Sequence, residues 1–240
     1  MIEFLNVVKK YPNGAVAVND ISFTVNDGEI VFIHGRTDSG KTTLRKLMLI
    51  EEKMTSGNIY FDNIPLSGIS DRNVYKHRRK IGVIFRESRL FVNKTVYENI
   101  AFALRALECP EGEIPKRCAV LLKLVGLEGL EKKYPDTLTG AQRQRAEIAR
   151  AMASNPKVIM ADEPTASLDH EAGLEILNLL MSINERGKTV IIFTKDEELA
   201  KQYRKRMITL DFGKVVSDES AVVSESAEIR LPEVSEQAEQ

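Results

Sequence analysis

The chain has 240 residues and a formal net charge of -1 at pH 7, with 43% apolar and 29% charged residues. These values are ordinary for a globular protein with a sizeable core, and the length favours one large α/β domain over two small ones. The near-neutral charge gives no reason to expect nucleic acid as the main partner.

No signal-peptide pattern opens the chain, and its apolar runs are too short to cross a bilayer. The two cysteines, Cys109 and Cys118, match no zinc or redox motif and favour a reducing, cytoplasmic environment.

Short strand-like runs open the chain, separated by the turn signals Pro12-Asn13-Gly14 and Asn19-Asp20. The runs at 2–8, 16–18 and 21–25 predict a small antiparallel sheet. A buried strand is expected over 29–34, and it leads into a glycine-rich loop and a helix that begins near Lys41. Apolar runs predict further strands at 59–61, 81–85, 158–161, 189–193 and 206–210.

Helical patterns fill the spaces between these strands. Ile176, Leu179, Leu180 and Ile183 recur at the spacing of one helix face, and the stretches 95–105 and 114–125 are also expected to be helical. Little strand signal lies between residues 81 and 158, which predicts a helical subdomain inserted over roughly 86–156.

The organisation is therefore one α/β domain over 1–216, with a mostly parallel sheet and flanking helices. Residues 217–240 are acidic and rich in serine, which predicts a disordered, solvated tail.

The strongest motif is the phosphate-binding loop, which runs from Gly35 to Thr42 in the pattern G-x-x-x-x-G-K-[ST]. Its backbone N–H groups and the following helix N-terminus form a nest for phosphate oxygens. Lys41 is expected to reach the β- and γ-phosphates, and the Thr42 hydroxyl to bind Mg²⁺. The predicted ATP-binding residues of this loop are Gly35, Arg36, Thr37, Asp38, Ser39, Gly40, Lys41, Thr42 and Thr43.

A second candidate site follows the apolar run at 158–161, where Asp162 and Glu163 stand at the end of a predicted strand. Asp162 is predicted to hold Mg²⁺, and Glu163 to polarise the attacking water as a general base. Together with the loop, the pair predicts an ATPase that uses ATP and Mg²⁺.

The order of the motifs over residues 1–216 resembles the ABC ATPase family, whose core has the P-loop NTPase fold. Between the two phosphate motifs, Leu138, Thr139, Gly140, Ala141 and Gln142 look like the family signature LSGGQ, and the run Ser167-Leu168-Asp169 is similar to its D-loop. The resemblance implies that Tyr11 stacks on adenine. It also implies a head-to-tail homodimer, in which the signature of one copy closes over the ATP of the other.

A narrower resemblance is to the bacterial cell-division ATP-binding protein family FtsE. It rests on the runs Tyr11-Pro-Asn-Gly14, Arg78-Arg-Lys-Ile-Gly82, Asn93-Lys-Thr-Val-Tyr-Glu-Asn99 and Ile148-Ala-Arg-Ala151. It implies an FtsX-like integral membrane partner, a peripheral position on the cytoplasmic face of the cell membrane, and control of wall hydrolysis during division.

Several residues depart from the family pattern at functional positions. Arg86 replaces a glutamine that senses Mg²⁺ and water, and Lys195 replaces a histidine that orients the γ-phosphate. Arg86 either weakens metal binding as a cation beside Mg²⁺ or binds the γ-phosphate directly, which would favour ATP binding over turnover. A protonated lysine cannot accept a hydrogen bond. Asp38 stands where the family often has Gly or Asn; it can adopt a left-handed conformation, but its charge faces the phosphates unfavourably. Ala141 would crowd the phosphate if its φ were positive. Arg86 and Lys195 are therefore catalytic candidates beside Glu163, and both are expected to affect the hydrolysis rate.

Three functions stay open from the sequence. The first is an active ATPase that drives a membrane partner. The second is a nucleotide-gated scaffold with little turnover, which Arg86 and Lys195 favour. The third is the ATPase of a lipoprotein-release or macrolide-type exporter. A P-loop GTPase or kinase is disfavoured, because neither explains the signature segment and no base-reading Asn-Lys-x-Asp motif is present.

Overall fold

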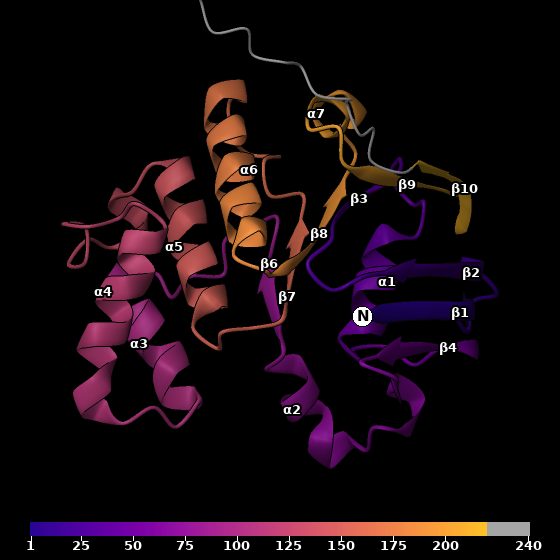
Figure 1. Ribbon diagram of the computed structural model, residues 1–240, viewed down its shortest axis with the longest axis horizontal. Coiled ribbons are helices and arrows are strands. Elements are labelled where there is room, and N and C mark those ends of the chain that lie inside the picture. The colour runs from indigo at the N-terminus through magenta and orange to yellow at the C-terminus, as the bar shows by residue number, and fades with distance from the viewer. Residues whose placement is uncertain (220–240) are drawn as a thin grey trace, which may run out of the picture.

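The computed structural model describes residues 1–219 and has two β-sheets with helices around them (Figure 1). The larger sheet has the strand order β10-β9-β3-β8-β7-β6, and all of its neighbours pair in parallel except β10, which runs antiparallel to β9. Its strands are β3 (Ile30–His34), β6 (Ile81–Ile84), β7 (Val158–Asp162), β8 (Thr189–Thr194), β9 (Arg206–Asp211) and β10 (Lys214–Glu219). The predicted α/β class with a mostly parallel sheet is confirmed.

The smaller sheet is antiparallel, as the sequence predicted, with the order β2-β1-β4-β5. Its strands are β1 (Ile2–Lys10), β2 (Val16–Val25), β4 (Ser56–Phe61) and β5 (Ile64–Pro65). The Asn-Asp pair that was predicted to separate two strands lies inside β2. Asp20 takes a φ of 58° there, and the pairing of β1 with β2 shifts register between Val7 and Lys9, so the pair forms a β-bulge and not a turn.

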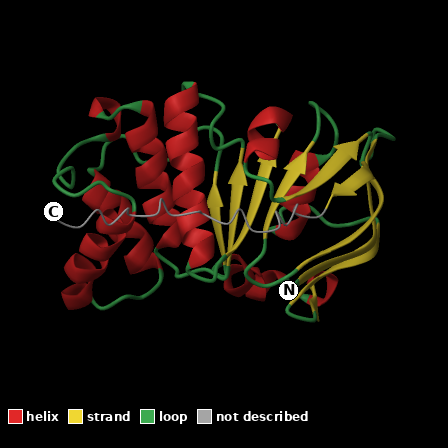
Figure 2. Cartoon of the chain, turned by 45° about the horizontal axis from the view of Figure 1, so that its top comes forward, coloured by secondary structure: helices red, strands yellow, loops and turns green. Residues whose placement is uncertain are grey.

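Seven α-helices occur in the described part of the chain. They are α1 (Lys41–Met48), α2 (Val74–Arg78), α3 (Val96–Ala106), α4 (Ile114–Leu124), α5 (Gly140–Met152), α6 (His170–Glu185) and α7 (Glu197–Gln202), with 3₁₀ turns at Leu66–Gly68, Asp71–Asn73, Glu111–Glu113 and Pro135–Thr137. The segment between β6 and β7 holds α3, α4 and α5, which is the helical insertion expected from the sequence (Figure 2). The sequence did not predict α2 and α7, which are too short to show a helical period.

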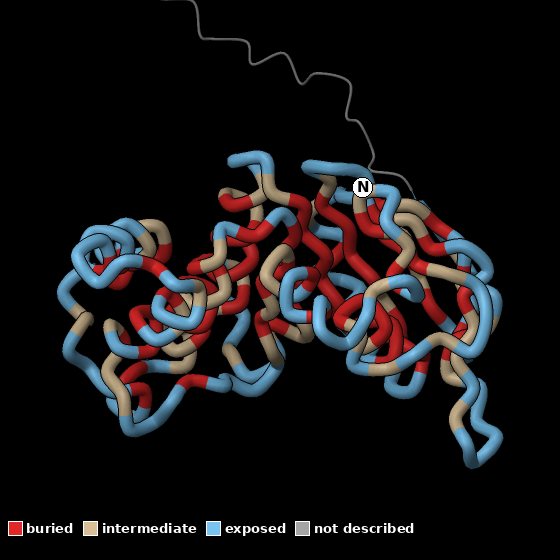
Figure 3. The backbone as a smooth tube through the Cα atoms, turned by 90° about the horizontal axis from the view of Figure 1, so that it is seen from below, coloured by how far each residue is buried: buried red, intermediate tan, exposed pale blue. Residues whose placement is uncertain are grey.

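Two hydrophobic cores meet at β3, which is buried along most of its length. Figure 3 shows the buried residues gathered in the interior, with exposed segments around the outside. Ile30 and Phe32 belong to the core shared with α3 to α6, whereas Val31 and Ile33 belong to the core shared with α1 and the smaller sheet. This alternation follows from the period of two along a strand. Helix α1 is therefore packed between the two sheets, and the loop that precedes it is held by a rigid framework.

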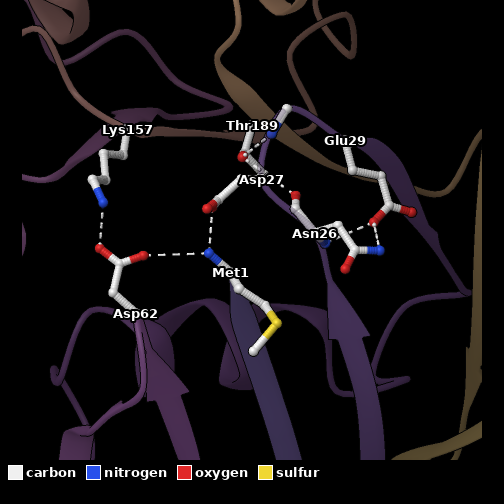
Figure 4. A network of polar contacts seen from close by, with 8 residues as sticks. Met1, Asn26, Asp27, Glu29, Asp62, Lys157 and Thr189 are labelled. Carbon is white, nitrogen blue, oxygen red and sulfur yellow. Dashed lines mark hydrogen bonds and ion pairs between the residues drawn. The ribbon is translucent and has the colours of Figure 1, made fainter.

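A polar network joins the smaller sheet to the start of β7 (Figure 4). The amino group of Met1 contacts the carboxylate of Asp27 and lies 3.3 Å from Asp62 Oδ1, and Lys157 Nζ donates to Asp62 Oδ2 at 2.5 Å. Lys157 directly precedes β7. The contacts therefore brace the two sheets at the amino-terminal end of that strand, away from the tips where the phosphate motifs lie.

The end of the described chain differs from the expected boundary. Residues 217–219 were assigned to the tail, but they form the last part of β10, where Asp218 pairs with Arg206. The remainder of the predicted acidic tail, 220–240, lies outside the described residues. Among residues 1–219, no helix is both long enough and apolar enough to span a bilayer.

Candidate nucleotide-binding site

A cavity of about 540 Å³ opens where the parallel strands end. Strand β3 leads into the loop before α1, β7 ends in Asp162, and Arg86 and Lys195 follow β6 and β8 closely. The crevice at the carboxyl ends of a parallel sheet is where α/β proteins bind ligands. The lining residues are Tyr11, Ala15, Val16, Ala17, Thr37, Asp38, Ser39, Gly40, Lys41, Thr42, Thr43, Arg86, Asp162, Glu163 and Lys195.

The phosphate loop is shaped by close backbone contacts. Gly40 has a φ of 103°, and a Cβ at this position would lie 2.5 Å from the carbonyl oxygen of Ala17. A Cβ on Gly35 would likewise lie 2.5 Å from Leu210 O. Asp38 takes a φ of 63°, the left-handed conformation that the sequence analysis allowed for it. Gly35 and Arg36 shape the loop but are not among the residues that line the cavity.

Lys41 lies inside this loop, with its ammonium group surrounded by oxygen atoms. Its Nζ contacts Gly35 O and donates to Arg36 O at 2.9 Å and to Ser39 Oγ at 3.3 Å. Burial lowers the pKa of Lys41, and the charges of Glu163 and Asp162 oppose that shift. The ammonium group can exchange these loop acceptors for phosphate oxygens, so the loop and Lys41 fit a polyphosphate.

Asp162 has an unexpected partner. Nε of Arg45, on α1, lies 3.1 Å from Asp162 Oδ2, and the side chain of Arg45 is only 6% exposed. Burial raises the pKa of Asp162 even though Arg45 and Lys41 oppose the shift. Arg45 was not predicted from the sequence. Its position in the sequence could have indicated it, because Arg45 directly follows Leu44 on the side of α1 that is buried.

The predicted magnesium ligands, Thr42 and Asp162, do not form a good Mg²⁺ site. Mg²⁺ requires a near-octahedral set of oxygen ligands. Thr42 is an exposed hydroxyl at the cavity, but Asp162 is already paired with Arg45, and the exposed cation Arg86 stands where the family places a neutral oxygen ligand. The residues fit ATP but fit its metal poorly.

Glu163 and Lys195 approach the cavity from neighbouring strand ends. Glu163 has a φ of 49°, and its N–H donates to Phe193 O, at the end of β8, at 2.8 Å. The conformation holds Glu163 directly beyond β7, where its side chain lines the cavity together with Lys195. Tyr11 forms another part of the wall, with its hydroxyl 3.4 Å from Thr43 Oγ1 and Lys9 Nζ 4.9 Å from its ring centre.

The signature residues lie apart from this cavity. Leu138 is buried, and Thr139 caps α5 by accepting from Gln142 N at 3.2 Å while Gln142 Oε1 accepts from Thr139 N at 3.0 Å. Gly140 lines a second cavity of about 360 Å³, to which Arg86 also contributes. Asp169 caps α6 by accepting from Ala172 N at 2.9 Å. Within one chain, neither Thr139 nor Asp169 reaches the phosphate loop's cavity.

The concern about Ala141 is removed by its conformation. It lies in the first turn of α5 and is not among the described residues with positive φ. Its methyl group therefore imposes no backbone strain.

A buried carboxylate behind the Arg86 loop was also missed. Glu147, on α5, is fully buried, and its Oε1 lies 3.5 Å from the backbone nitrogens of Phe85 and Arg89 and 3.6 Å from Arg150 Nη2. Burial raises the pKa of Glu147 against the charge of Arg150. This group links α5 to the loop that carries Arg86.

The fold and the cavity define a P-loop nucleotide-binding domain. A family model described as ABC transporter matches residues 18–166. The chain belongs to this family of ATP-binding domains, whose members bind ATP, typically with Mg²⁺. The sequence is 41% identical over 220 residues to the cell division ATP-binding protein FtsE of Bacillus subtilis (strain 168), covering 92% of this chain and 96% of that protein.

Other relatives extend the comparison. FtsE of Mycobacterium tuberculosis is 39% identical, over 91% of this chain and 96% of that protein. A methionine import ATP-binding protein, MetN 2 of Bacillus cereus, is 40% identical, over 91% of this chain and 66% of that protein. Among solved structures, a dimer of the ATP-binding cassette MJ0796 bound to ADP and Pi has a TM-score of 0.82 and 35% identity, covering 92% of this chain and 99% of that one.

Proposed function

We propose that this chain is the ATP-hydrolysing subunit of an FtsE-like membrane complex in bacterial cell division. It works at the cytoplasmic face of the membrane, bound to an FtsX-like integral membrane protein, and its ATP cycle controls hydrolysis of the cell wall. Support comes from the similarity to FtsE proteins, which extends over 96% of the B. subtilis relative.

The observation that carries the ATPase proposal is that one cavity contains Lys41, Asp162 and Glu163. Lys41 and the loop amides bind the triphosphate, and Glu163 accepts a proton from the attacking water. Tyr11, at the cavity wall, stacks on the adenine ring. Membership of the ABC transporter family supports ATP hydrolysis in general. The rate in this chain depends on Arg86 and Lys195, the two cations that replace the usual family residues.

The same site acts in a head-to-tail homodimer. The signature residues are outside the phosphate cavity of their own chain, so they are free to meet the nucleotide of a second copy. The N-terminal amides of α5 and the Thr139 hydroxyl then face its γ-phosphate. The related cassette MJ0796 is described as dimeric with ADP and Pi, which supports this arrangement.

A second candidate function is a nucleotide-gated scaffold that closes on ATP and turns it over slowly. Arg86 and Lys195 favour it, because both line the cavity and neither can accept a hydrogen bond from the attacking water while it is protonated. In that case the bound nucleotide would set the state of the membrane partner, and hydrolysis would contribute little.

Phosphate release from ATP by the purified chain separates these functions. An ATPase releases phosphate steadily, and Lys41→Ala abolishes the release. A scaffold binds ATP without steady release. Light scattering of Glu163→Gln with ATP tests the homodimer, because blocked hydrolysis should trap the closed pair. A monomer under these conditions would rule out ATP-driven dimerisation.

The membrane partner requires its own experiment. The chain is purified in mild detergent from the membranes of its native cell, and the bound proteins are identified by mass spectrometry. An FtsX-like protein is expected. Recovery of a methionine permease, or of a lipoprotein or macrolide exporter subunit, would replace the cell-division proposal with a transport function.

A further inference from the structure

The guanidinium group of Arg45 is a buried cation directed at Asp162. Its Nε is 3.1 Å from Asp162 Oδ2, and its Nη1 is 3.8 Å from Glu51 Oε2. Neither Nε nor Nη1 has a hydrogen bond of normal geometry. Asp162 is the closer carboxylate, and charge attraction is therefore the main interaction that holds this cation in place.

The surroundings of Arg45 prevent it from leaving easily. The Arg45 side chain is 6% exposed, and its guanidinium carbon lies 5.3 Å from the ring centre of Phe85. The guanidinium carbon of Arg89 lies 3.6 Å from the same ring centre. Removing the partner of a buried ion leaves an uncompensated charge, which is strongly unfavourable. A metal ion that took over Asp162 would leave Arg45 with only the more distant Glu51, 3.8 Å away, as a counter-ion, and Arg45 would also repel the metal.

The remaining charges of the cavity suit an anion without a metal. Because Asp162 is neutralised by Arg45, the lining cations Lys41, Arg86 and Lys195 face the lining carboxylates Asp38 and Glu163. The cations are in excess, and they stand at the ends of the strands that surround the phosphate loop. Triphosphate oxygens can therefore form charge-assisted hydrogen bonds with protein cations at positions where a metal ion would otherwise contact them.

We infer that this site binds ATP as the metal-free nucleotide, with Arg45 occupying Asp162 and with Lys41, Arg86 and Lys195 supplying the charge that Mg²⁺ supplies elsewhere. The inference rests on the proposed ATP binding and concerns the binding step. It makes Arg45 a positioning residue that determines whether the site uses a metal.

The test is the dissociation constant of ATP, measured by isothermal titration calorimetry with excess Mg²⁺ and with excess EDTA. For the native chain, the two constants should agree within about threefold. In Arg45→Leu, Asp162 becomes available to the metal, and Mg²⁺ should strengthen binding by at least about tenfold, since a difference of about 1.4 kcal/mol corresponds to that factor. Native binding that needs Mg²⁺, or an unchanged ratio in Arg45→Leu, would overturn the inference.

The matched control is Arg206→Leu, which removes another largely buried arginine that pairs with two carboxylates, Glu29 and Asp218, far from Asp162 in the sheet. Its ratio of dissociation constants should equal that of the native chain. Circular dichroism establishes that each variant is folded, and Arg45→Gln replaces Arg45→Leu if the latter is not. If neither folds, the native ratio alone decides.

The outcomes also separate this inference from the proposed function. Failure of ATP to bind under both conditions would contradict both. Binding and hydrolysis that both depend strictly on Mg²⁺ would contradict the inference and leave the ATPase proposal intact.

Discussion

Arg206 on β9 and Asp218 on β10 form an ion pair through two contacts, Nε to Oδ1 and Nη2 to Oδ2, each 2.7 Å long. Nη1 of the same arginine lies 2.9 Å from Glu29 Oε1, just before β3. The pair therefore ties the antiparallel edge strand to the strand that leads into the phosphate loop, and it explains why the folded domain continues past residue 216.

Asp218→Asn should lower the free energy of unfolding by about 1 kcal/mol, because a two-contact arginine pair is lost but is partly screened by solvent. Chemical denaturation measures the change. Glu219→Gln is the control: the exposed Glu219 accepts from Ser217 Oγ, and its substitution should leave stability nearly unchanged. Equal effects of the two substitutions would show that the pair adds nothing specific.

Restoring the family residues at the two unusual cavity positions should increase turnover. Lys195→His returns a hydrogen-bond acceptor near Glu163 and should raise the rate of phosphate release by about 10²-fold. Arg86→Gln should raise it further. Steady-state phosphate release at saturating ATP is the measurement, with ATP affinity measured in parallel. Rates that stay at the native level would mean that these two cations do not limit hydrolysis.

Stability should depend on pH through Glu147. Its pKa is raised by burial above the ordinary value of 4.5, so the folded chain retains a proton that the unfolded chain has released. The free energy of unfolding therefore falls as the pH rises from about 4.5 through the raised pKa, and Glu147→Gln removes this loss. The native chain should become progressively less stable relative to Glu147→Gln over that range, as denaturation at several pH values would measure.

Glu98 provides a control of opposite sign. Its pKa is lowered, mainly by the hydrogen bond from the Thr95 backbone, so its contribution is present above the ordinary pKa of 4.5 and is lost as the pH falls. Relative to Glu98→Gln, the native chain should gain stability with rising pH. A flat difference for Glu147→Gln would show that its carboxylate is not desolvated.

The contribution of the Thr139 cap of α5 to the free energy of unfolding should be measurable by substitution. Thr139 and Gln142 satisfy each other's backbone N–H groups. Thr139→Ala should lower the free energy of unfolding by about 1 kcal/mol, whereas Thr139→Ser keeps the hydroxyl and should lie close to the native chain. Thermal denaturation of the three chains would decide. Equal stability of Thr139→Ala and Thr139→Ser would show that the hydroxyl is not needed to cap α5.

Local patterns predicted the framework of the site well. Lys41 sits in a motif of fixed spacing, and Asp162 and Glu163 follow an apolar run, so their approach at the sheet edge follows from parallel strand order. Arg45 and Glu147 were not predicted, because the contacts that matter here lie far away in the sequence. Arg45 pairs with Asp162, and Glu147 meets the backbone of the loop that carries Arg86. Tertiary packing decides whether a charged residue on an apolar helix face meets a counter-ion. The spacing of residues along one helix gives no information about that packing.

The errors at the level of elements have a similar cause. An Asn-Asp pair favours a turn, yet Asp20 forms a bulge, because residues before and after it along β2 pair with β1. Asp218 belongs to an acidic segment typical of a solvated tail, but Arg206 gives it a partner. In both cases a long-range contact outweighs the local preference.

The strand order has a consequence for biosynthesis. Strand β8 lies between β3, which leads into the phosphate loop, and β7, which carries Asp162. Until residues 189–194 have left the ribosome, these two strands have no ladder to join them, although both have already been made. A nascent chain that stops before this point cannot hold Lys41 and Asp162 in register, so nucleotide can act as a ligand for folding only late in translation.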